Sequence, residues 1–596
     1  MLDYKKLFSI RLAACIKDAA GGAGVPAEEI FGDISTPPDD KMGDYAYPCF
    51  KLARVLRKAP PVIAADLCAR FNALPDKHFS GAEAAAGYMN VRLERHGFIA
   101  DTLNHILQKN NAFGQSETGK EKTVCIDYSS VNIAKQFHMG HLTNTALGGS
   151  LYKIFKFLGY NVVGINHLGD YGTQFGNMIA AYRRWGSEKE LKKRGVSALQ
   201  DWYVRFHAEE ENDPSLKEEG RACFRAIEEK DPVALDVFGL FKRITLDEAA
   251  GVYNDLNVAF DSWNGESFYT DKIPAVVEEL KEKNLLTLSE GAQVIDLETE
   301  KLPPALILRS DGAGLYLTRD LAAAEYRAKT YNFDKCLYVV AYQQNLHFKQ
   351  LFAVLERMGK PWAANCVHVA HGMVSMADGA MSTRRGKVIL LKDVLKQAVE
   401  KTREIIESKN PDLPDKGAVA KQVGTGAVIY GALSSARIKD TVFDYDKALN
   451  FDGETGPYVM YTHARCKSVL LRSSQENAFA QRTNDKGQMT NEDSCHLSVL
   501  NTGEASRLDD NEAFFLTKLL YKFPETVASA ARDCEPSYIT RLITDAAQAF
   551  NKFYFEHKIL ADNAEERSAR LKLTAATANV LKTGLGLLLM DAPEQM

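Results

Sequence analysis

The sequence predicts a multidomain α/β protein with a central parallel-sheet domain, an N-terminal α/β extension and an all-helical C-terminal domain. The chain has 596 residues, whereas a single domain typically holds ~150. From Thr123 onward, short apolar runs alternate with helical segments, as in a parallel sheet with helical crossovers. From about residue 394 the periodicity is helical to the end. We therefore expect domains at 1–115, 116–395 and 396–596, with an insertion into the central domain at about 183–300.

The composition is that of an ordinary globular protein. Hydrophobic residues make up 45% and charged residues 25% of the chain, which argues against disorder and fibrous structure. The ten cysteines form no Cys-x-x-Cys pair, so neither structural zinc nor a disulfide framework is expected, and no metal-binding residues are predicted. No apolar run reaches the ~20 residues of a membrane helix, and the N-terminus is unlike a signal peptide, so we expect a cytoplasmic protein without a membrane partner. The net charge of −5 does not by itself decide whether nucleic acid is bound.

The N-terminal extension begins with a predicted amphipathic helix near Leu7, which ends at the glycine-rich turn 21–26. A second helix is expected from about Tyr47 to Pro60. Two turn-rich segments, residues 37–46 and 87–93, lie beside these helices and fit a small α/β module.

The most informative stretch runs from Asp127 to His141. It follows a predicted buried strand at 123–126 and precedes a helix that ends near Gly159. His138 and His141 would stand side by side at the helix start, among backbone N–H groups that have no partner within the helix. Gly140 permits close approach and Lys135 adds a positive charge, so the stretch predicts a cradle for phosphates. The histidine pair alone is also compatible with surface histidines or part of a metal site.

The other elements of the central domain are predicted in order along the chain. A second buried strand at 160–167 leads into the glycine-spaced loop 169–176, at the strand end where open α/β sheets bind ligands. The many charged residues of the segment 183–235 predict a solvent-exposed helical insertion. The nucleotide-binding sheet is then expected to resume at 305–309 and to continue with strands at 336–341 and 367–370.

Two features are predicted in the C-terminal part. Residues 474–510 are polar and turn-rich, which predicts a surface loop. One helical face is expected to be apolar, formed by Ile539, Leu542, Ile543, Ala546, Phe550, Phe553 and His557.

The run Ser129–Leu142 closely resembles the ATP-binding motif of class I aminoacyl-tRNA synthetases, in the form found in arginyl-tRNA synthetases. That family usually has proline where this chain has Val131. Residues 381–389 resemble the second class I motif, Lys-Met-Ser-Lys-Ser, but with Ala380 in place of the first lysine. Further segments that resemble the same family, in the expected order, are residues 37–46, 87–93, 169–176, 261–269, 451–465 and 591–596.

This resemblance implies a Rossmann-like catalytic domain and a helical anticodon-binding domain. It also implies an arginine–tRNA ligase, which converts L-arginine and ATP to arginyl-adenylate and pyrophosphate and then transfers arginine to the terminal adenosine 2′-hydroxyl of tRNA(Arg), releasing AMP. The expected partners are L-arginine, ATP as a substrate with Mg²⁺, and tRNA(Arg), bound by a monomer.

The resemblance also implies roles for individual residues. The expected catalytic residues are Lys135, His138, His141 and Arg384. The expected ATP-binding residues are His138, Gly140, His141, Gly372, Met373, Val374, Ser382, Arg384 and Arg385. The expected arginine-binding residues are Ser130, Val131, Asn132, His141, Glu266, Tyr316, Asp320 and Gln344. The expected tRNA-binding residues are Tyr88, Asn90, Tyr458, Tyr461 and Arg465.

The residue types of the expected arginine site suit a guanidinium substrate. Tyr316 and Asp320 are four residues apart, so they share one face at a helix start. A carboxylate can accept two N–H bonds in the fork geometry that arginine presents and lysine lacks. Asp320 could instead be an ordinary acid in the first turn of a helix.

Two other functions remain open. A nucleotidylyltransferase acting on a small metabolite could use the same histidine cradle, but it has no need of some 200 C-terminal helical residues. A catalytically idle tRNA-binding relative is suggested by Val131 and Ala380. The presence of Lys135, His138, His141 and Asp320 argues against it.

Overall fold

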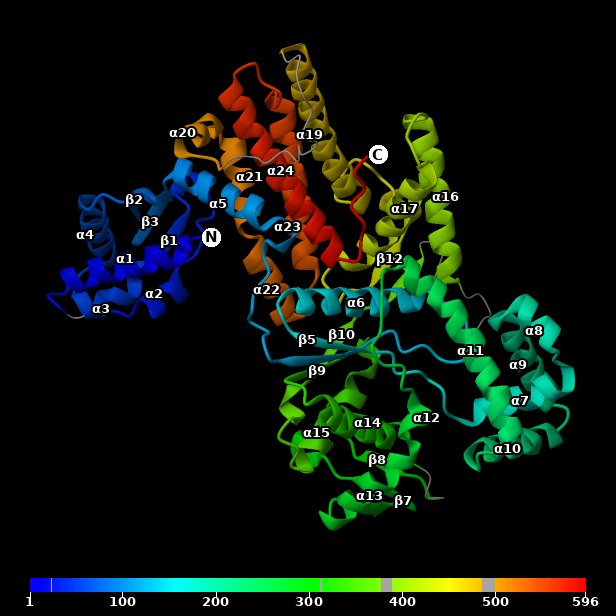
Figure 1. Ribbon diagram of the computed structural model, residues 1–596. Coiled ribbons are helices and arrows are strands. Elements are labelled where there is room, and N and C mark those ends of the chain that lie inside the picture. Colours follow the sequence, from blue (N-terminus) through cyan, green and yellow to red (C-terminus); the bar gives the residue numbers. More distant parts are fainter. Residues whose placement is uncertain (23, 311–313, 377–388, 485–498) are drawn as a thin grey trace. The chain divides into compact units, whose positions relative to one another are not determined.

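The computed structural model describes all residues of the chain except 23, 311–313, 377–388 and 485–498 (Figure 1). The chain forms two compact units. The first unit consists of Met1–Phe113, Cys466–Lys522 and Ala546–Val580, and the second of Gly114–Arg465, Phe523–Asp545 and Leu581–Met596. Each unit is therefore assembled from segments that are far apart in the sequence.

The first unit contains a three-stranded antiparallel sheet in the order β1-β3-β2. Its strands are β1 (Tyr45–Pro48), β2 (Phe79–Ala85) and β3 (Tyr88–Leu93). Its helices include α1 (Tyr4–Ala19), α2 (Ala27–Asp33), α3 (Leu52–Leu56), α4 (Pro60–Ala73), α5 (Arg95–Lys109), α20 (Thr502–Ala505) and α21 (Asn511–Tyr521). The buried rings of Phe8, Phe71 and Phe79 lie 5.7–6.1 Å apart between centroids and hold α1, α4 and β2 together.

The predicted helix from about Tyr47 is wrong in its first part. Tyr47 is buried in strand β1, and the helix α3 starts only at Leu52. Phe50 and Val55, which suggested a buried helical face, are half exposed. Apolar side chains at helical spacing misled the prediction, because a short strand followed by a 3₁₀ turn produces a similar pattern.

The second unit is built on a four-stranded sheet in the order β10-β9-β4-β5, with every pair of neighbours parallel. The strands are β4 (Thr123–Asp127), β5 (Asn161–Ile165), β9 (Lys335–Ala341) and β10 (Cys366–His371). Val124, Cys125 and Ile126 of β4 are fully buried, as a central parallel strand requires. The chain leaves β4 toward β5 and returns on its other side with β9, so the strand order reverses between β4 and β9, the point where such sheets bind ligands.

Helices cover both faces of this sheet (Figure 1). Helix α6 (Leu142–Phe157) packs on β4, β5 and β9 from one side. On the other side α13 (Ile273–Glu282), α14 (Tyr316–Tyr331) and α15 (Asn345–Arg357) share one hydrophobic core with Cys125, Cys336 and Tyr338 of the strands. Helix α15 begins shortly after the carboxyl end of β9, and α14 begins with Tyr316 and includes Asp320, two of the predicted arginine-binding residues.

Between β5 and β9 the chain forms an insertion of helices and a separate small sheet. The helices are α7 (Thr173–Trp185), α8 (Glu188–Arg194), α9 (Val196–Glu210), α10 (Ser215–Glu228), α11 (Pro232–Asp255) and α12 (Glu266–Tyr269). The strands β6 (Thr287–Ser289), β7 (Ala292–Ile295) and β8 (Ala305–Leu308) form an antiparallel sheet of their own. The prediction that residues 305–309 resume the nucleotide-binding sheet is therefore wrong.

Among the described residues after β10, the regular structure is helical apart from a short parallel pair, β11 (Val374–Met376) with β12 (Thr441–Phe443). The helices are α16 (Leu391–Lys409), α17 (Lys416–Leu433), α18 (Tyr445–Ala448), α19 (Gly456–Asn484), α22 (Phe523–Asp533), α23 (Ser537–Glu556) and α24 (Ala564–Leu587). Helix α19 continues to Asn484, and residues 502–508 form α20 and a 3₁₀ turn, so the predicted loop at 474–510 is wrong in its first and last parts. Residues 485–498 of this prediction lie outside the described residues. The predicted apolar face of α23 is confirmed, because its members from Ile539 to Phe553 are buried. Within the described residues, no helix combines the length and the apolar character needed to cross a membrane.

Candidate active site

Some of the predicted site residues lie in segments that follow the parallel strands: Ser130 to His141 after β4, Gln344 after β9 and Gly372–Val374 after β10. The loop after β4 and the loop after β5 are joined by backbone hydrogen bonds: Ile133 N–H donates to the Gly169 carbonyl and Gly169 N–H to the Val131 carbonyl, both at 3.0 Å. A Cβ on Gly169 would lie 2.1 Å from Asn132 Oδ1, so a side chain at this position would displace the Asn132 amide. Asn132 is held at the loop junction with its side chain exposed, and Val131 is buried beside it.

His138 and His141 form a reciprocal cap at the start of α6. Gly140 N–H donates to His138 Nδ1 at 3.1 Å, and His138 N–H donates to His141 Nδ1, also at 3.1 Å. The ring centroids are 4.0 Å apart. Since His138 Nδ1 accepts a hydrogen bond, its neutral ring carries the proton on Nε2, which remains as a donor for a ligand. His141 Nδ1 also lies 3.2 Å from the His138 carbonyl, so His141 Nε2 is a donor or an acceptor according to the tautomer of this ring.

The expectation of unpaired backbone N–H groups at this helix start is wrong. The amides of His138 and Gly140 donate to the imidazoles, the Met139 amide donates to the Ile389 carbonyl at 2.9 Å, and the His141 amide donates to the His138 carbonyl at 2.9 Å. The sequence does not reveal this, because histidine is not among the usual N-cap residues. The donors available to a phosphate here are thus side-chain groups.

Both imidazoles are neutral at pH 7 in the ligand-free protein. Burial, followed by the charge of nearby Lys135, lowers the pKa of His138. Burial and the neighbouring His138 lower the pKa of His141 to about 3. Lys135, which is exposed on the same loop, is consequently the positive charge of the cradle.

The loop after β10 is fixed by residues that follow α17. Gly372 N–H donates to the Arg437 carbonyl and Met373 N–H donates to Asp440 Oδ1, both at 2.7 Å. Arg437 Nη1 donates to the Ala370 carbonyl at 2.6 Å, and its backbone N–H lies 3.2 Å from both oxygens of Glu535. Hydrogen bonds with the segment between α17 and β12 therefore fix the predicted ATP-binding backbone Gly372–Val374.

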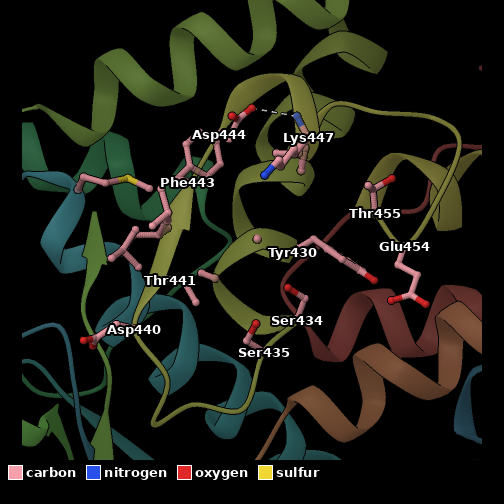
Figure 2. A pocket seen from close by; sticks show the side chains of 18 residues that line it. Tyr430, Ser434, Ser435, Asp440, Thr441, Phe443, Asp444, Lys447, Glu454 and Thr455 are labelled. Atoms are coloured by element: carbon pink, nitrogen blue, oxygen red, sulfur yellow. Dashed lines mark hydrogen bonds between the residues drawn. The ribbon is translucent and has the colours of Figure 1, made fainter. Parts of the chain in front are cut away.

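A cavity of about 350 Å³ lies beside this backbone (Figure 2). Met139, Leu142 and Val374 contribute its apolar side, and the remaining lining comes from α17, β12, α18 and the start of α19. Figure 2 shows Asp440, Asp444, Lys447 and Glu454 around it. Neither His138 nor His141 lines the cavity, so it adjoins the cradle without being part of it.

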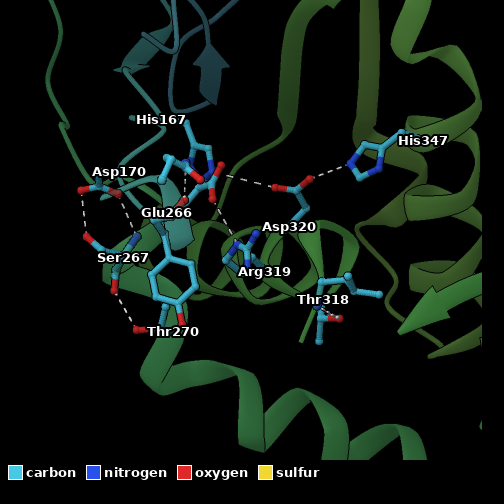
Figure 3. Close-up of polar contacts among 12 residues, drawn as sticks. His167, Asp170, Glu266, Ser267, Thr270, Thr318, Arg319, Asp320 and His347 are labelled. Atoms are coloured by element: carbon cyan, nitrogen blue, oxygen red, sulfur yellow. Dashed lines mark hydrogen bonds and ion pairs between the residues drawn. The ribbon is translucent and has the colours of Figure 1, made fainter. Parts of the chain in front are cut away.

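Acidic side chains converge near the start of α14 (Figure 3). Asp320 lies 2.6 Å from His347 Nε2 through Oδ2 and 3.9 Å from His167 Nε2 through Oδ1, and its side chain is 28% exposed. Asp127 accepts from Ser130 Oγ at 2.8 Å and forms an ion pair with the buried Arg327 at 2.7 Å. Ser130 is thus oriented through a carboxylate that is already neutralised inside the protein.

Glu266 faces Arg319 across an ion pair of 3.2 Å. Asp170 fixes the position of Glu266, because it accepts from the Ser267 N–H and hydroxyl at 2.8 Å and pairs with Lys242 at 2.9 Å. Burial raises the pKa of Glu266 to about 7, although the Arg319 charge opposes this. Near neutral pH this carboxyl is therefore close to half protonated in the ligand-free protein.

The structure places the other predicted residues as follows. Tyr316 is the first residue of α14 and is 63% exposed, with its ring centroid 4.9 Å from the Arg319 guanidinium. Gln344 is exposed at the end of the 3₁₀ turn η7 (Tyr342–Gln344), directly before α15. Ser382, Arg384 and Arg385, like Ala380, lie outside the described residues.

The predicted tRNA-binding residues differ in accessibility. Tyr88 is 39% exposed against the ring of Phe50, whereas Asn90 is only 5% exposed within β3. On α19, Tyr461 is partly exposed and its ring lies 4.8 Å from the Arg465 guanidinium, and Tyr458 is half-buried. Burial makes Asn90 the least accessible of the five.

Comparison with known proteins places this site in a family. The model described as "tRNA synthetases class I (R), catalytic domain" matches residues 102–445, "DALR anticodon binding domain" matches 459–596, and "Arginyl tRNA synthetase N terminal domain" matches 10–93. A protein of Halothermothrix orenii named arginine–tRNA ligase is 46% identical over 596 residues, covering 100% of both chains. The chain belongs to the arginyl-tRNA synthetase family. A further arginine–tRNA ligase, from Clostridium beijerinckii, is 47% identical over 94% of this chain and 96% of its own length.

Solved structures of arginyl-tRNA synthetases share the fold. The Thermus thermophilus enzyme matches with a TM-score of 0.79 and 25% identity, covering 100% of both chains. The Plasmodium falciparum enzyme, at 22% identity, matches with a TM-score of 0.75 and covers 99% of each chain. In this arginyl-tRNA synthetase family member the class I catalytic match spans the histidine cradle and every predicted arginine-binding residue.

Several residues of this site were missed by the sequence reasoning. Arg327 and His347 join the network around Asp320, and Arg437 and Asp440 hold the loop after β10. Arginine and aspartate occur throughout the chain, and the partners of these residues lie up to 200 positions away. No local sequence signal distinguishes these residues from surface charges. His347 is the exception, because it lies three positions after Gln344 and could have been included among the predicted arginine-binding residues.

A metal site was considered among the described residues. One group, Asp510, Glu512 and His557, brings possible ligand atoms within 4.8 Å of one another. Lys552 Nζ already lies 3.1 Å from the Glu512 carboxylate. The group belongs to the first unit and contains none of the predicted catalytic residues.

Proposed function

We propose that this chain activates L-arginine with ATP and transfers it to tRNA(Arg). The observation that carries the proposal is that the loop after β4, which leads to the histidine cradle, is linked to the Asp320 carboxylate of α14 through Asp127, Arg327 and His167. The full-length similarity to arginine–tRNA ligases supports it.

In the activation step, an arginine carboxylate oxygen attacks the α-phosphorus of ATP, and pyrophosphate leaves. The Nε2–H groups of His138 and His141 would donate to phosphate oxygens, and Lys135 would neutralise charge that develops on them. Mg²⁺ would arrive on the nucleotide and supply further neutralisation, because the cradle itself offers imidazole and ammonium groups and no carboxylates. The backbone at Gly372–Val374 would receive the adenine.

We extend the proposal to three residues that lie outside the described part of the chain. Ser382 would bind ATP, and Arg384 and Arg385 would neutralise charge on the phosphates. The residues directly after them are attached to the cradle: Leu391 N–H donates to the Phe137 carbonyl at 3.0 Å and the Ile389 carbonyl accepts from Met139 N–H. This attachment supports a role of the loop in stabilising the leaving pyrophosphate.

For arginine we propose recognition by two carboxylates. Asp320 would accept the guanidinium fork, and Glu266 would contribute a second acceptor once ionised. Tyr316 would cover the guanidinium, while Ser130, Val131, Asn132 and Gln344 would orient the α-amino and carboxylate groups. His141 would border both substrates.

For tRNA we propose contacts through Tyr88, Tyr458, Tyr461 and Arg465, with Asn90 acting through the strand that carries it. The second reaction step is attack of the 2′-hydroxyl of the terminal adenosine on the arginyl carbonyl, with AMP as the leaving group. A monomeric, cytoplasmic enzyme stays a prediction.

The test is ATP–pyrophosphate exchange and arginine attachment, with arginine and tRNA present. Arginine-dependent exchange together with charged tRNA is the expected result. Exchange that needs a small metabolite instead of arginine would indicate the nucleotidylyltransferase, and tRNA binding without any exchange would indicate the idle relative.

A further inference from the structure

The Asp320 carboxylate is held between two imidazoles that come from different parts of the chain (Figure 3). His347 Nε2 lies 2.6 Å from Oδ2, and His167 Nε2 lies 3.9 Å from Oδ1. His347 sits in the first turn of α15, just after β9, and His167 follows β5. One oxygen of the carboxylate of the proposed arginine site is therefore held by a hydrogen bond from His347, and the other has the His167 imidazole nearby.

The buried Arg327 determines which nitrogen of His167 carries the proton. A guanidinium can only donate, and Arg327 Nη2 lies 3.3 Å from His167 Nδ1, so this Nδ1 accepts. The proton of the neutral ring is then on Nε2, which faces Asp320. Arg327 is itself fixed, since it is 1% exposed and pairs with Asp127 at 2.7 Å.

His347 makes the shorter contact, and the carboxylate keeps room for a substrate. A separation of 2.6 Å is that of a strong hydrogen bond to a charged acceptor. A carboxylate offers about four lone-pair positions, and His347 occupies one of them, whereas His167 Nε2 at 3.9 Å is beyond hydrogen-bond distance. The remaining lone pairs are left for an incoming guanidinium at the exposed side of Asp320. A carboxylate fixed before binding loses less conformational entropy when the substrate arrives.

We propose that His347 is a positioning residue for arginine recognition, which orients the Asp320 carboxylate so that its free lone pairs meet the substrate guanidinium. The proposal rests on the proposed function, because it assumes that Asp320 contacts arginine. It assigns His347 no contact with ATP and no part in phosphoryl chemistry.

The packing around His347 separates this role from a structural one. Its side chain is 24% exposed, and α15 is anchored by its neighbour Phe348, which is buried and stacks on His368 at 4.3 Å between centroids. Loss of the His347 imidazole should therefore leave the helix in place.

The ionisation of Asp320 gives a second prediction. Burial works against its charged form, but the hydrogen bond and charge of His347, and the charges of His167 and Arg327, outweigh burial and lower the pKa of Asp320. Glu266, from α12, is the acidic group that opposes them, and it is itself paired with Arg319. Without His347 the pKa of Asp320 should rise, so arginine recognition should be lost at a higher pH than in the wild type.

The test compares His347→Leu, His347→Gln and His207→Leu in the full chain with tRNA present. Glutamine keeps an N–H donor of similar reach. His207 is the matched control, because its Nδ1 lies 2.9 Å from the Glu210 carboxylate on α9, a histidine–carboxylate pair of the insertion. The readouts are the Michaelis constants for arginine and ATP, kcat, the pH profile of kcat/KM for arginine, and the unfolding temperature.

We expect His347→Leu to raise the Michaelis constant for arginine about 10-fold, the scale of one lost hydrogen bond to a charged group, with that for ATP within twofold. The acidic limb of the pH profile of kcat/KM for arginine should move to higher pH in this variant. His347→Gln should recover most of the arginine affinity, and His207→Leu should match the wild type.

An unchanged arginine constant in His347→Leu would overturn the proposal. Equal losses for arginine and ATP with a lower unfolding temperature would also overturn it, by assigning His347 a structural role. Failure of the proposed function looks different: the wild type itself would then show no arginine-dependent exchange.

Discussion

At the scale of single residues, His138 and His141 each accept a backbone N–H with the ring atom Nδ1 and leave Nε2 for a ligand. The same two side chains therefore cap a helix and present their Nε2 atoms to a ligand. Their lowered pKa values favour the neutral rings that this arrangement needs, because an imidazolium has no ring nitrogen able to accept the amide. The two histidines thus form the helix cap and the ligand cradle at the same time.

Replacing either histidine with alanine should lower adenylate formation by roughly 10²- to 10³-fold, the usual effect of losing one donor to a transition-state charge. Loss of the cap should cost about 1 kcal/mol of stability in addition. ATP–pyrophosphate exchange and thermal unfolding measure the two effects separately, with His207→Ala as the control. Near-normal exchange in either variant would remove that histidine from the chemistry.

Glu266 provides a prediction on pH. Its pKa is raised from 4.5 to about 7, so the folded protein binds this proton more tightly than the unfolded chain does. The stability contributed by the proton is present below pH 4.5 and is lost as the pH rises through about 7. Glu266→Gln should remove this part of the pH dependence of the free energy of unfolding, measured with urea between pH 4.5 and 8. An unchanged pH dependence would mean that Glu266 titrates normally.

At the scale of elements, the loop after β10 depends on the segment between α17 and β12. Arg437 and Asp440 hold its carbonyl and amide groups, and a Cβ on Gly372 would lie 2.2 Å from the Lys439 carbonyl oxygen. Gly372→Ala must therefore displace backbone on one side or the other.

We expect Gly372→Ala to raise the Michaelis constant for ATP at least ~10-fold while that for arginine changes little, because the displaced backbone is the one proposed to bind adenine. Gly239→Ala in α11 is the matched control, since nothing lies within 4 Å of its added Cβ. Steady-state kinetics with each substrate varied in turn gives the comparison. A normal ATP constant in Gly372→Ala would show that this backbone does not hold the nucleotide.

Elements were predictable from sequence where one strong pattern dominates. The strands β4, β5, β9 and β10 are short and mostly apolar, and the buried face of α23 repeats at helical spacing. The run at 305–308 is equally apolar, but an apolar run does not say which sheet it joins, so β8 was assigned to the wrong one. Likewise the cradle was found because its residues are adjacent in sequence, whereas His347, Arg327 and Arg437 act on partners distant in the chain.

At the scale of the whole molecule, the two compact units are interleaved in the sequence. Helices α19, α23 and α24 each contain residues of both units. Composition and net charge contain no information on this arrangement. The predicted domain boundaries at 115 and 395 assume contiguous domains and stay predictions.

The central claim is that this sheet edge binds ATP and arginine together, with Asp320 as the selector for the guanidinium. Arginine-dependent ATP–pyrophosphate exchange, measured with saturating tRNA for the wild type and Asp320→Asn, tests it most directly. Asparagine keeps the shape but removes the charge. We predict exchange in the wild type and a loss in the variant of at least ~2 kcal/mol in kcat/KM for arginine, about 30-fold, with the ATP constant nearly unchanged. Arginine kinetics within a few-fold of the wild type would contradict the claim and point to Glu266 or Asp127 as the selector.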